Sequence, residues 1–154
     1  MYGAIIGDIV GSRFEWTPHK TKEFKLFTSE CTPTDDSVLT VAVAEAIMSD
    51  NDFESHLRYW GLKYPNAGYG GAFLDWLMND LPVSNSYGNG SAMRVSPIGW
   101  MYESLEETRK MARMSAEVTH NHPEGVKGAE SVASAMWLAR NGHSKTQIKN
   151  YIQR

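Results

Sequence analysis

The apolar run VLTVAVAEAIM, residues 38–48, constrains the fold of this chain more than any other stretch. It is apolar on nearly every side and carries the small residues Ala42, Ala44 and Ala46, a pattern typical of a helix packed closely inside a core. Its valines leave a β-strand open, but its length favours a helix. We therefore expect a buried helix over 37–48, with the rest of the chain packed around it.

Four polar residues, Thr34, Asp35, Asp36 and Ser37, stand directly before this run or at its start. Threonine or aspartate before an apolar run is an ordinary N-cap, and acidic residues in the first turn complement the helix dipole. The same side chains offer only oxygen ligands, which suit a hard divalent cation such as Mg²⁺ or Mn²⁺. Taken alone, the stretch favours capping over metal binding.

Length and composition exclude several classes of protein. The 154 residues are enough for a single domain that buries roughly 68–70% of its unfolded surface. A net charge of −3 gives no basic surface for nucleic acid, and the single cysteine, Cys31, excludes a disulfide framework or a cysteine-based zinc cluster. There is no apolar run of membrane-spanning length, and Asp8 interrupts the N-terminal one, which lacks the basic start of a signal peptide. We expect a cytoplasmic protein without nucleic-acid or membrane partners.

The N-terminal segment carries a second pair of carboxylates. Periodicity does not distinguish a strand from a buried helix over 4–11. In a helix, Asp8, Gly11 and Glu15 would share one face, with the two carboxylates about 10 Å apart along the axis. Gly11 would leave room between them for a ligand or another backbone. In the alternative interpretation Asp8 is a cap and Glu15 lies in solvent.

A glycine-rich loop follows further along the chain, where Gly88 and Gly90 flank Asn89 and Ser91 could begin a helix. Backbone N–H groups at a helix start bind anions, and Arg94 one turn later could add a charge-assisted hydrogen bond. This arrangement suits a phosphate or diphosphate. Gly-Asn-Gly is also common in plain turns, so the pattern alone favours an ordinary loop.

The remaining segments show helical spacing separated by Gly, Pro and polar breaks. His120 and His122 precede Pro123, which is well placed at the first position of a helix. The two histidines cannot share a helix face, and zinc would need a third ligand that the sequence does not offer. We expect one of them to cap the helix or to hydrogen-bond a ligand. The expected helices cover 52–64, 72–78, 104–118, 123–141 and a last segment from 145 onward, and residues 17–33 are expected to form a loop.

Five motifs, in chain order, resemble the ADP-ribosylglycohydrolase family (dinitrogenase reductase-activating glycohydrolase and its relatives): GDIVGSRFE, PTDDS, GYGG, GNGSAMRVSPIG and THNHPEGVKGAE. The resemblance covers about residues 1–140. It implies an all-α orthogonal helical bundle with two Mg²⁺ or Mn²⁺ ions in a cleft. Its implied activity is hydrolysis of the N- or O-glycosidic bond between ADP-ribose and an acceptor.

The resemblance also implies roles for single residues. Metal ligands are expected at Thr34, Asp35 and Asp36, and catalytic carboxylates at Glu15 and Asp36. Glycoside hydrolysis has an oxocarbenium-like transition state, which carboxylates stabilise and a metal-bound water can attack. Because unpaired buried carboxylates are costly, we expect the separated acidic residues, Asp8 included, to converge in one cleft. Contacts with ADP-ribose are expected from Tyr69, Asn89, Gly90, Ser91, Met93 and His122.

The sequence departs from the family in one respect. Complete members resemble one another in a second motif, Asp-x-Asp-Ser/Thr, which supplies further metal ligands and is absent here. We therefore expect residues 1–154 to form a single partial domain, truncated relative to the family, with a weakly bound ion. A final helix would leave Ile148, Tyr151 and Ile152 uncovered, which predicts self-association or a complementary second-half chain. The alternative is a catalytically silent protein that binds ADP-ribose or has a structural role.

Overall fold

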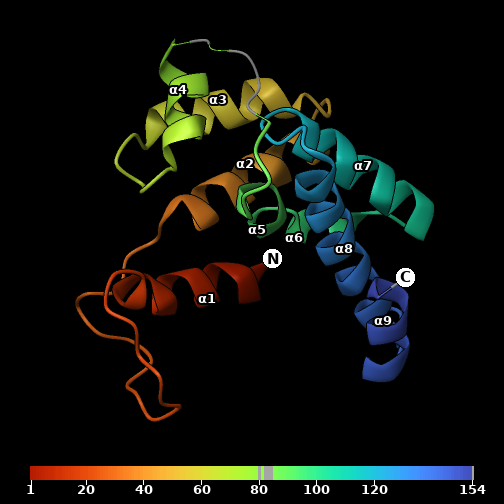
Figure 1. The fold of residues 1–154 in the computed structure, drawn as a ribbon, viewed down its shortest axis with the longest axis horizontal. Helices are drawn as coiled ribbons and strands as arrows, with labels where there is room; N and C mark the ends of the chain where they lie inside the picture. The colour runs from red at the N-terminus through yellow and green to blue at the C-terminus, as the bar shows by residue number, and fades with distance from the viewer. Residues whose placement is uncertain (80, 82–84, 154) are drawn as a thin grey trace.

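The computed structural model describes residues 1–79, 81 and 85–153. Within these residues the chain forms helices and no strand (Figure 1), which confirms the all-α prediction. The strand alternatives for 4–11 and 38–48 are therefore excluded. The elements are α1 (Tyr2–Gly11), the 3₁₀ turn η1 (Ser12–Phe14), α2 (Asp35–Met48), α3 (Phe53–Lys63), α4 (Gly71–Asn79), α5 (Gly90–Met93), α6 (Ser96–Met101), α7 (Leu105–Glu117), α8 (Pro123–Arg140) and α9 (Lys145–Ile152).

Helix α2 lies at the centre of the fold, as its composition predicts. Leu39, Ala42, Val43 and Ala46 are buried, and the helix packs against α1, α3 and α6. Its small alanines allow these neighbours to approach closely, and α3 runs beside it in Figure 1. The helix begins at Asp35, so the acidic pair forms its first turn.

Helices α7 and α8 pack along each other and form the second part of the core. Helix α6 crosses α8 at Gly99, where a Cβ atom would lie 2.7 Å from Cβ of Met136. In Figure 1, α1 and α2 run across the view while α8 runs down the opposite side. The loops that join these two parts carry the candidate site.

The two ends of the chain differ in how well they are covered. Helix α9 packs on α8, and Ile148 and Tyr151 are half-buried, so the prediction that they are uncovered was wrong. Ile152 is exposed, as predicted. Neither α9 nor α1 has a buried residue, and in the apolar helix α1 Ile6 is 51% exposed. None of the helices in the described part of the chain is both long enough and apolar enough to span a membrane.

Candidate active site

Asp8 joins α1 to the start of α2. Its carboxylate accepts hydrogen bonds from the backbone N–H groups of Thr34 (2.9 Å) and Ser37 (3.1 Å), and from both of their hydroxyls. First-turn N–H groups have no partner inside their own helix, so they need such an acceptor. Asp8 therefore serves as a cap, and the helix that it caps lies 26 residues further along the chain. This clamp fixes the position of the acidic first turn of α2.

The acidic residues converge, as predicted. Asp8, Glu15, Asp35 and Asp36 line one open cleft of about 920 Å³, between α1 and the start of α2. The cleft is also lined by Thr34, Tyr69, Asn89 and Met93 and by the glycines Gly7, Gly11, Gly68, Gly70 and Gly71. The three glycines from the loop before α4 and at its start keep that wall of the cleft free of side chains.

The electrostatics of this cleft favour a bound cation. Burial and repulsion from Asp36 and Glu15 raise the pKa of Asp35 to about 6. Burial and the Asp8 and Glu15 carboxylates also raise the pKa of Asp36. A hard divalent ion would relieve both effects, and the ligands present are oxygens. However, in residues 1–79, 81 and 85–153 no three His, Cys, Asp or Glu side chains are grouped closely enough to hold an ion. The residues therefore fit such an ion in their chemistry but supply only part of a coordination shell.

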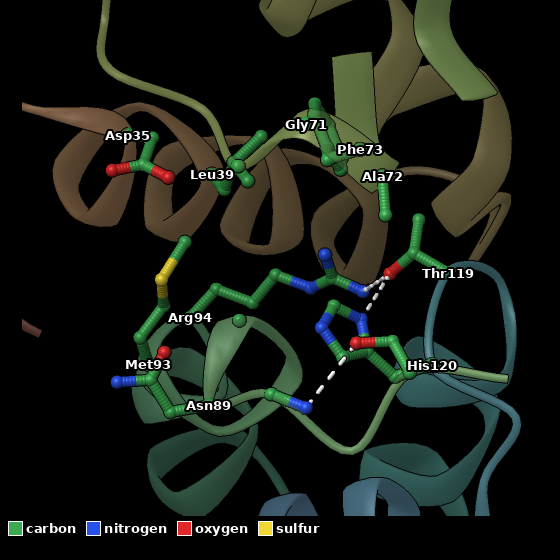
Figure 2. A pocket seen from close by; sticks show the side chains of 14 residues that line it. Asp35, Leu39, Gly71, Ala72, Phe73, Asn89, Met93, Arg94, Thr119 and His120 are labelled. Atoms are coloured by element: carbon green, nitrogen blue, oxygen red, sulfur yellow. Dashed lines mark hydrogen bonds between the residues drawn. The ribbon is translucent and has the colours of Figure 1, made fainter. Parts of the chain in front are cut away.

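A second pocket, of about 270 Å³, lies behind the glycine loop (Figure 2). It shares Asp35, Gly70, Gly71, Asn89 and Met93 with the cleft, so the two cavities adjoin. Its other lining residues are Leu39, Ala72, Phe73, Ser86, Gly88, Gly90, Arg94, Thr119 and His120. The loop, α2, α4 and the α7–α8 connection thus surround one space.

A chain of hydrogen bonds crosses the inner end of this pocket. Arg94 is fully buried, and its Nη2 donates to the carbonyl oxygen of Ser115 (2.7 Å) and to Oγ1 of Thr119 (2.8 Å). Oγ1 of Thr119 lies 2.8 Å from Nδ1 of His120. Burial lowers the pKa of Arg94 to about 9, so the guanidinium stays charged at neutral pH. Burial and this nearby charge lower the pKa of His120 to about 4.

Comparison with known proteins identifies the family. The family model for ADP-ribosylglycohydrolase matches residues 1–154. The chain belongs to the ADP-ribosylglycohydrolase family. It is 29% identical to the ADP-ribosylhydrolase ARH3 of Homo sapiens over 94% of this chain and 50% of that protein. It is 25% identical to the ADP-ribosylarginine hydrolase Tri1 of Pseudomonas putida over 96% of this chain and 47% of that protein. The chain therefore spans about half the length of these curated relatives.

Within this member of the family, Ser91 anchors the loop. Its fully buried hydroxyl donates to the carbonyl oxygen of Gly125 on α8 (2.9 Å). Gly125 allows this close approach, because a Cβ atom there would lie 2.7 Å from the carbonyl oxygen of Ser86. The predicted contact of Ser91 with substrate stays a prediction, and the structure gives its side chain a packing role.

The two histidines have different positions. His122 is the N-cap of α8, where Nδ1 accepts from the N–H of Glu124 (3.1 Å) and the ring packs edge-on against Tyr87. His120 instead lines the pocket behind the loop. The prediction that one of the two histidines caps the helix is confirmed by His122, and its predicted contact with substrate stays a prediction. The signal was available in Pro123: proline at the first helical position makes the residue before it the N-cap.

Four predicted substrate contacts line the cavities. Asn89 and Met93 border both cavities, and Gly90 borders the smaller one. Tyr69 borders the larger one and stacks on Phe73 with 5.0 Å between ring centroids. Its buried hydroxyl has no hydrogen-bond partner among the described residues, so it is available to a ligand.

Proposed function

We propose that this chain is one half of a metal-dependent ADP-ribosyl hydrolase that cleaves the N- or O-glycosidic bond between ADP-ribose and an acceptor. The observation that carries the proposal is the convergence of four carboxylates in a cleft that adjoins the glycine-loop pocket. Such a site can hold the reacting ribose beside carboxylates while the loop holds the rest of the nucleotide. The names of the relatives, which act on ADP-ribosyl bonds, agree with this chemistry.

Each part of the site has a task in this proposal. Thr34, Asp35 and Asp36 would hold Mg²⁺ or Mn²⁺, which when bound supplies a Lewis acid for water and ribose hydroxyls. Glu15 and Asp36 stabilise the positive charge that develops on the ribose in the transition state. Asp8 keeps the first turn of α2 in place through its four hydrogen bonds. Asn89, Gly90 and Met93 position the nucleotide, and Tyr69 offers a buried hydroxyl.

Full activity in this proposal needs a complementary second half. The sequence has no Asp-x-Asp-Ser/Thr motif, and the described carboxylates make only part of a metal shell. A second copy of the chain could not lend these ligands, so self-association alone should not restore full activity. A stable monomer that turns over substrate as fast as a full-length relative would contradict this part of the proposal.

A direct test measures ADP-ribose release from an ADP-ribosylated peptide, with and without Mg²⁺ or Mn²⁺, at several protein concentrations checked by light scattering. We expect slow, metal-dependent release that is lost in Glu15→Gln and Asp36→Asn. Asp75→Asn on α4 removes an exposed carboxylate that lines neither cavity and should leave release unchanged. Release that needs no metal, or that survives Asp36→Asn, would refute the assignment.

The second candidate is a catalytically silent ADP-ribose-binding protein. It is favoured by the contrast between the two cavities: residues of this chain enclose the loop pocket, whereas the carboxylate cleft is open and short of ligands. Calorimetry separates the candidates. Heat of ADP-ribose binding without any ADP-ribose release, with Mg²⁺ present, would favour the silent protein.

A further inference from the structure

We propose that Asp8 is a positioning residue for the cation of the cleft: it takes the hydroxyl proton of Thr34 and thereby leaves both lone pairs of that oxygen to a hard divalent cation. Asp8 itself belongs to the outer shell of the site and is not a ligand. The inference rests on the proposed function, in which Thr34, Asp35 and Asp36 hold Mg²⁺ or Mn²⁺. It goes beyond the capping role of Asp8, because it concerns the direction of a single hydrogen bond.

The first argument is that the Thr34 side chain is released from capping. Thr34 is the N-cap residue of α2, yet its side chain makes no capping hydrogen bond. A threonine at this position ordinarily accepts from the N–H of the second or third helical residue. The third residue is Ser37, and its N–H donates instead to Oδ2 of Asp8 (3.1 Å). The Thr34 oxygen is therefore free of the task that threonine normally has at a helix start.

The second argument is the direction of the hydrogen bond that Thr34 does make. A carboxylate can only accept, so the hydroxyl of Thr34 gives its one proton to Oδ1 of Asp8. The hydroxyl oxygen keeps two acceptor lone pairs, and no group within residues 1–79, 81 and 85–153 donates to it. Because Thr34 lines the cleft, it presents there an oxygen that can only accept. Hard divalent cations bind oxygens of this kind.

The third argument is that Asp8 has little capacity left to bind an ion itself. A carboxylate has about four lone-pair sites on its two oxygens. Asp8 accepts four hydrogen bonds, from the N–H and the hydroxyl of Thr34 and of Ser37, and three of them end on Oδ2. Although Asp8 lines the cleft, its acceptor sites are thus taken by the protein. It acts on an ion through Thr34, as outer-shell partners of metal ligands generally do.

The two hydroxyls that donate to Asp8 differ in what they border, and this supplies a matched control. Thr34 lines the cleft, whereas Ser37 lines a separate groove together with Val38 and Trp60. Removing the Ser37 hydroxyl therefore deletes one hydrogen bond to Asp8 and changes no oxygen that borders the cleft. A role of Asp8 in merely holding the turn predicts an effect of this change on the ion, and a role through Thr34 does not.

The test compares Asp8→Asn with Ser37→Ala, with folding of each variant checked by circular dichroism. The amide oxygen of asparagine can still accept from backbone N–H groups, but its NH₂ group is a donor. It would donate to the Thr34 oxygen and occupy one of its lone pairs. Titration with Mn²⁺ alone, followed by electron paramagnetic resonance of the free ion, gives the affinity. We expect Asp8→Asn to weaken Mn²⁺ binding by about tenfold to a hundredfold, the range for outer-shell partners, and Ser37→Ala to match the wild type.

Asp8→Asn also removes a negative charge, and a double-mutant cycle with Thr34→Val separates this effect. Thr34→Val keeps the charge of Asp8 but removes the oxygen through which Asp8 is proposed to act. In that background Asp8→Asn should cause a much smaller loss of Mn²⁺ affinity than in the wild type, since residues that act as a unit are not additive. Thr34→Ser keeps a hydroxyl and should retain most of the affinity. Additive losses would show that Asp8 acts by its charge or as a ligand, and would refute the inference.

A readout without metal reports the hydrogen bond directly. In proton NMR spectra of the metal-free wild type, the hydroxyl proton of Thr34 should show a nuclear Overhauser contact with the Hβ protons of Asp8. Ser37→Ala should keep this contact. The NMR measurement and the two Thr34 variants also serve if Asp8→Asn does not fold. A Thr34 hydroxyl proton placed away from Asp8, or wild-type Mn²⁺ affinity in folded Asp8→Asn or Thr34→Val, would overturn the inference. So would a loss in Ser37→Ala as large as that in Asp8→Asn.

The outcomes for this inference and for the proposed function are separable. If Asp8 and Thr34 are coupled in Mn²⁺ binding but no ADP-ribosyl bond is cleaved, the positioning role stands and the hydrolase proposal fails. If the wild type releases ADP-ribose in a metal-dependent reaction and Asp8→Asn binds Mn²⁺ as tightly as the wild type, the reverse holds. A folded wild type that binds no Mn²⁺ at tens of millimolar refutes the inference, and the release assay still decides the hydrolase proposal.

Discussion

The substitution Gly125→Ala tests whether close packing of the glycine loop on α8 holds the site together. A Cβ atom at this position would lie 2.7 Å from the carbonyl oxygen of Ser86 and 3.3 Å from Cβ of His120. The Ser86 contact is with backbone, so the loop must move by about 0.7 Å to restore an ordinary 3.4 Å separation. Overpacking of this kind costs about 1–3 kcal/mol, and the better helix propensity of alanine returns about 1 kcal/mol of that. We expect a net loss of up to about 2 kcal/mol in unfolding free energy.

Gly128→Ala, one turn further along α8, is the matched control. Its Cβ would meet only the Ala92 Cβ atom at 3.9 Å, which is ordinary van der Waals contact. Here only the gain in helix propensity remains, so we expect stabilisation by about 0.5–1 kcal/mol. Urea and thermal unfolding followed by circular dichroism would show melting temperatures that differ by about 1–12 °C between the two variants. If Gly125→Ala proves as stable as Gly128→Ala, the loop does not pack on α8 as described.

Four further predictions concern charge and surface. His120, which faces Arg94 and shares its pocket with Asp35, has a folded pKa of about 4 against an unfolded 6.5. The contribution of His120 to the free energy of unfolding is therefore fully present above pH 6.5 and is lost as the pH falls towards 4, by at most about 3 kcal/mol. In urea unfolding, the unfolding free energy of His120→Gln should fall less steeply between pH 6.5 and pH 4 than that of the wild type. Asp35 affects stability in the opposite direction. Its pKa is raised to about 6, so its ionised form lowers the free energy of unfolding above pH 6. Asp35→Asn should therefore be more stable than the wild type at pH 8, by about 1 kcal/mol after allowance for solvent screening. Mg²⁺ should raise the melting temperature of the wild type more than that of Asp35→Asn. Replacing the exposed Tyr2 and Ile6 of α1 by serine should reduce self-association in light scattering without lowering stability.

Local patterns were sufficient to predict much of this fold. The helix over 35–48 follows from small and branched apolar residues behind a polar first turn, and its burial follows from this local pattern. The capping box of Ser144 and Gln147 at the start of α9 is a local feature of this kind, because its two hydrogen bonds lie within four residues. The acidic cleft was predicted from two arguments: unpaired buried carboxylates cost free energy, and the family resemblance places acidic residues beside a metal site. Both arguments predict that the separated carboxylates converge in one cleft.

Features that depend on distant contacts could not be predicted in the same way. The sequence allows Asp8 to be either a helix cap or a ligand, but it does not show that the helix capped by Asp8 begins 26 residues further along the chain. Arginine is rarely buried without a partner, so nothing in sequence marks Arg94 as fully buried. Its neighbour Thr119 comes from a different segment and only the fold brings the two together. The place of His120 in the loop pocket likewise depends on a contact between distant segments, since its ring packs closely against Gly90.

The two adjoining cavities differ in how much of this chain they need. The loop pocket is bordered by α2, α4, α5 and the α7–α8 connection, all packed on the main core, and its charge comes from a residue inside that core. The carboxylate cleft has α1 as one wall, and α1 is an apolar helix without a buried residue. Ligand recognition should therefore be nearly complete in these 154 residues. In the proposed function, bond cleavage would also need further carboxylates and cover for α1, which a second half would supply; the curated relatives are about twice the length of this chain. It follows that substitutions in the loop pocket should change affinity in the isolated chain, whereas the effect of Glu15 and Asp36 should reach its full size only when the cleft is completed.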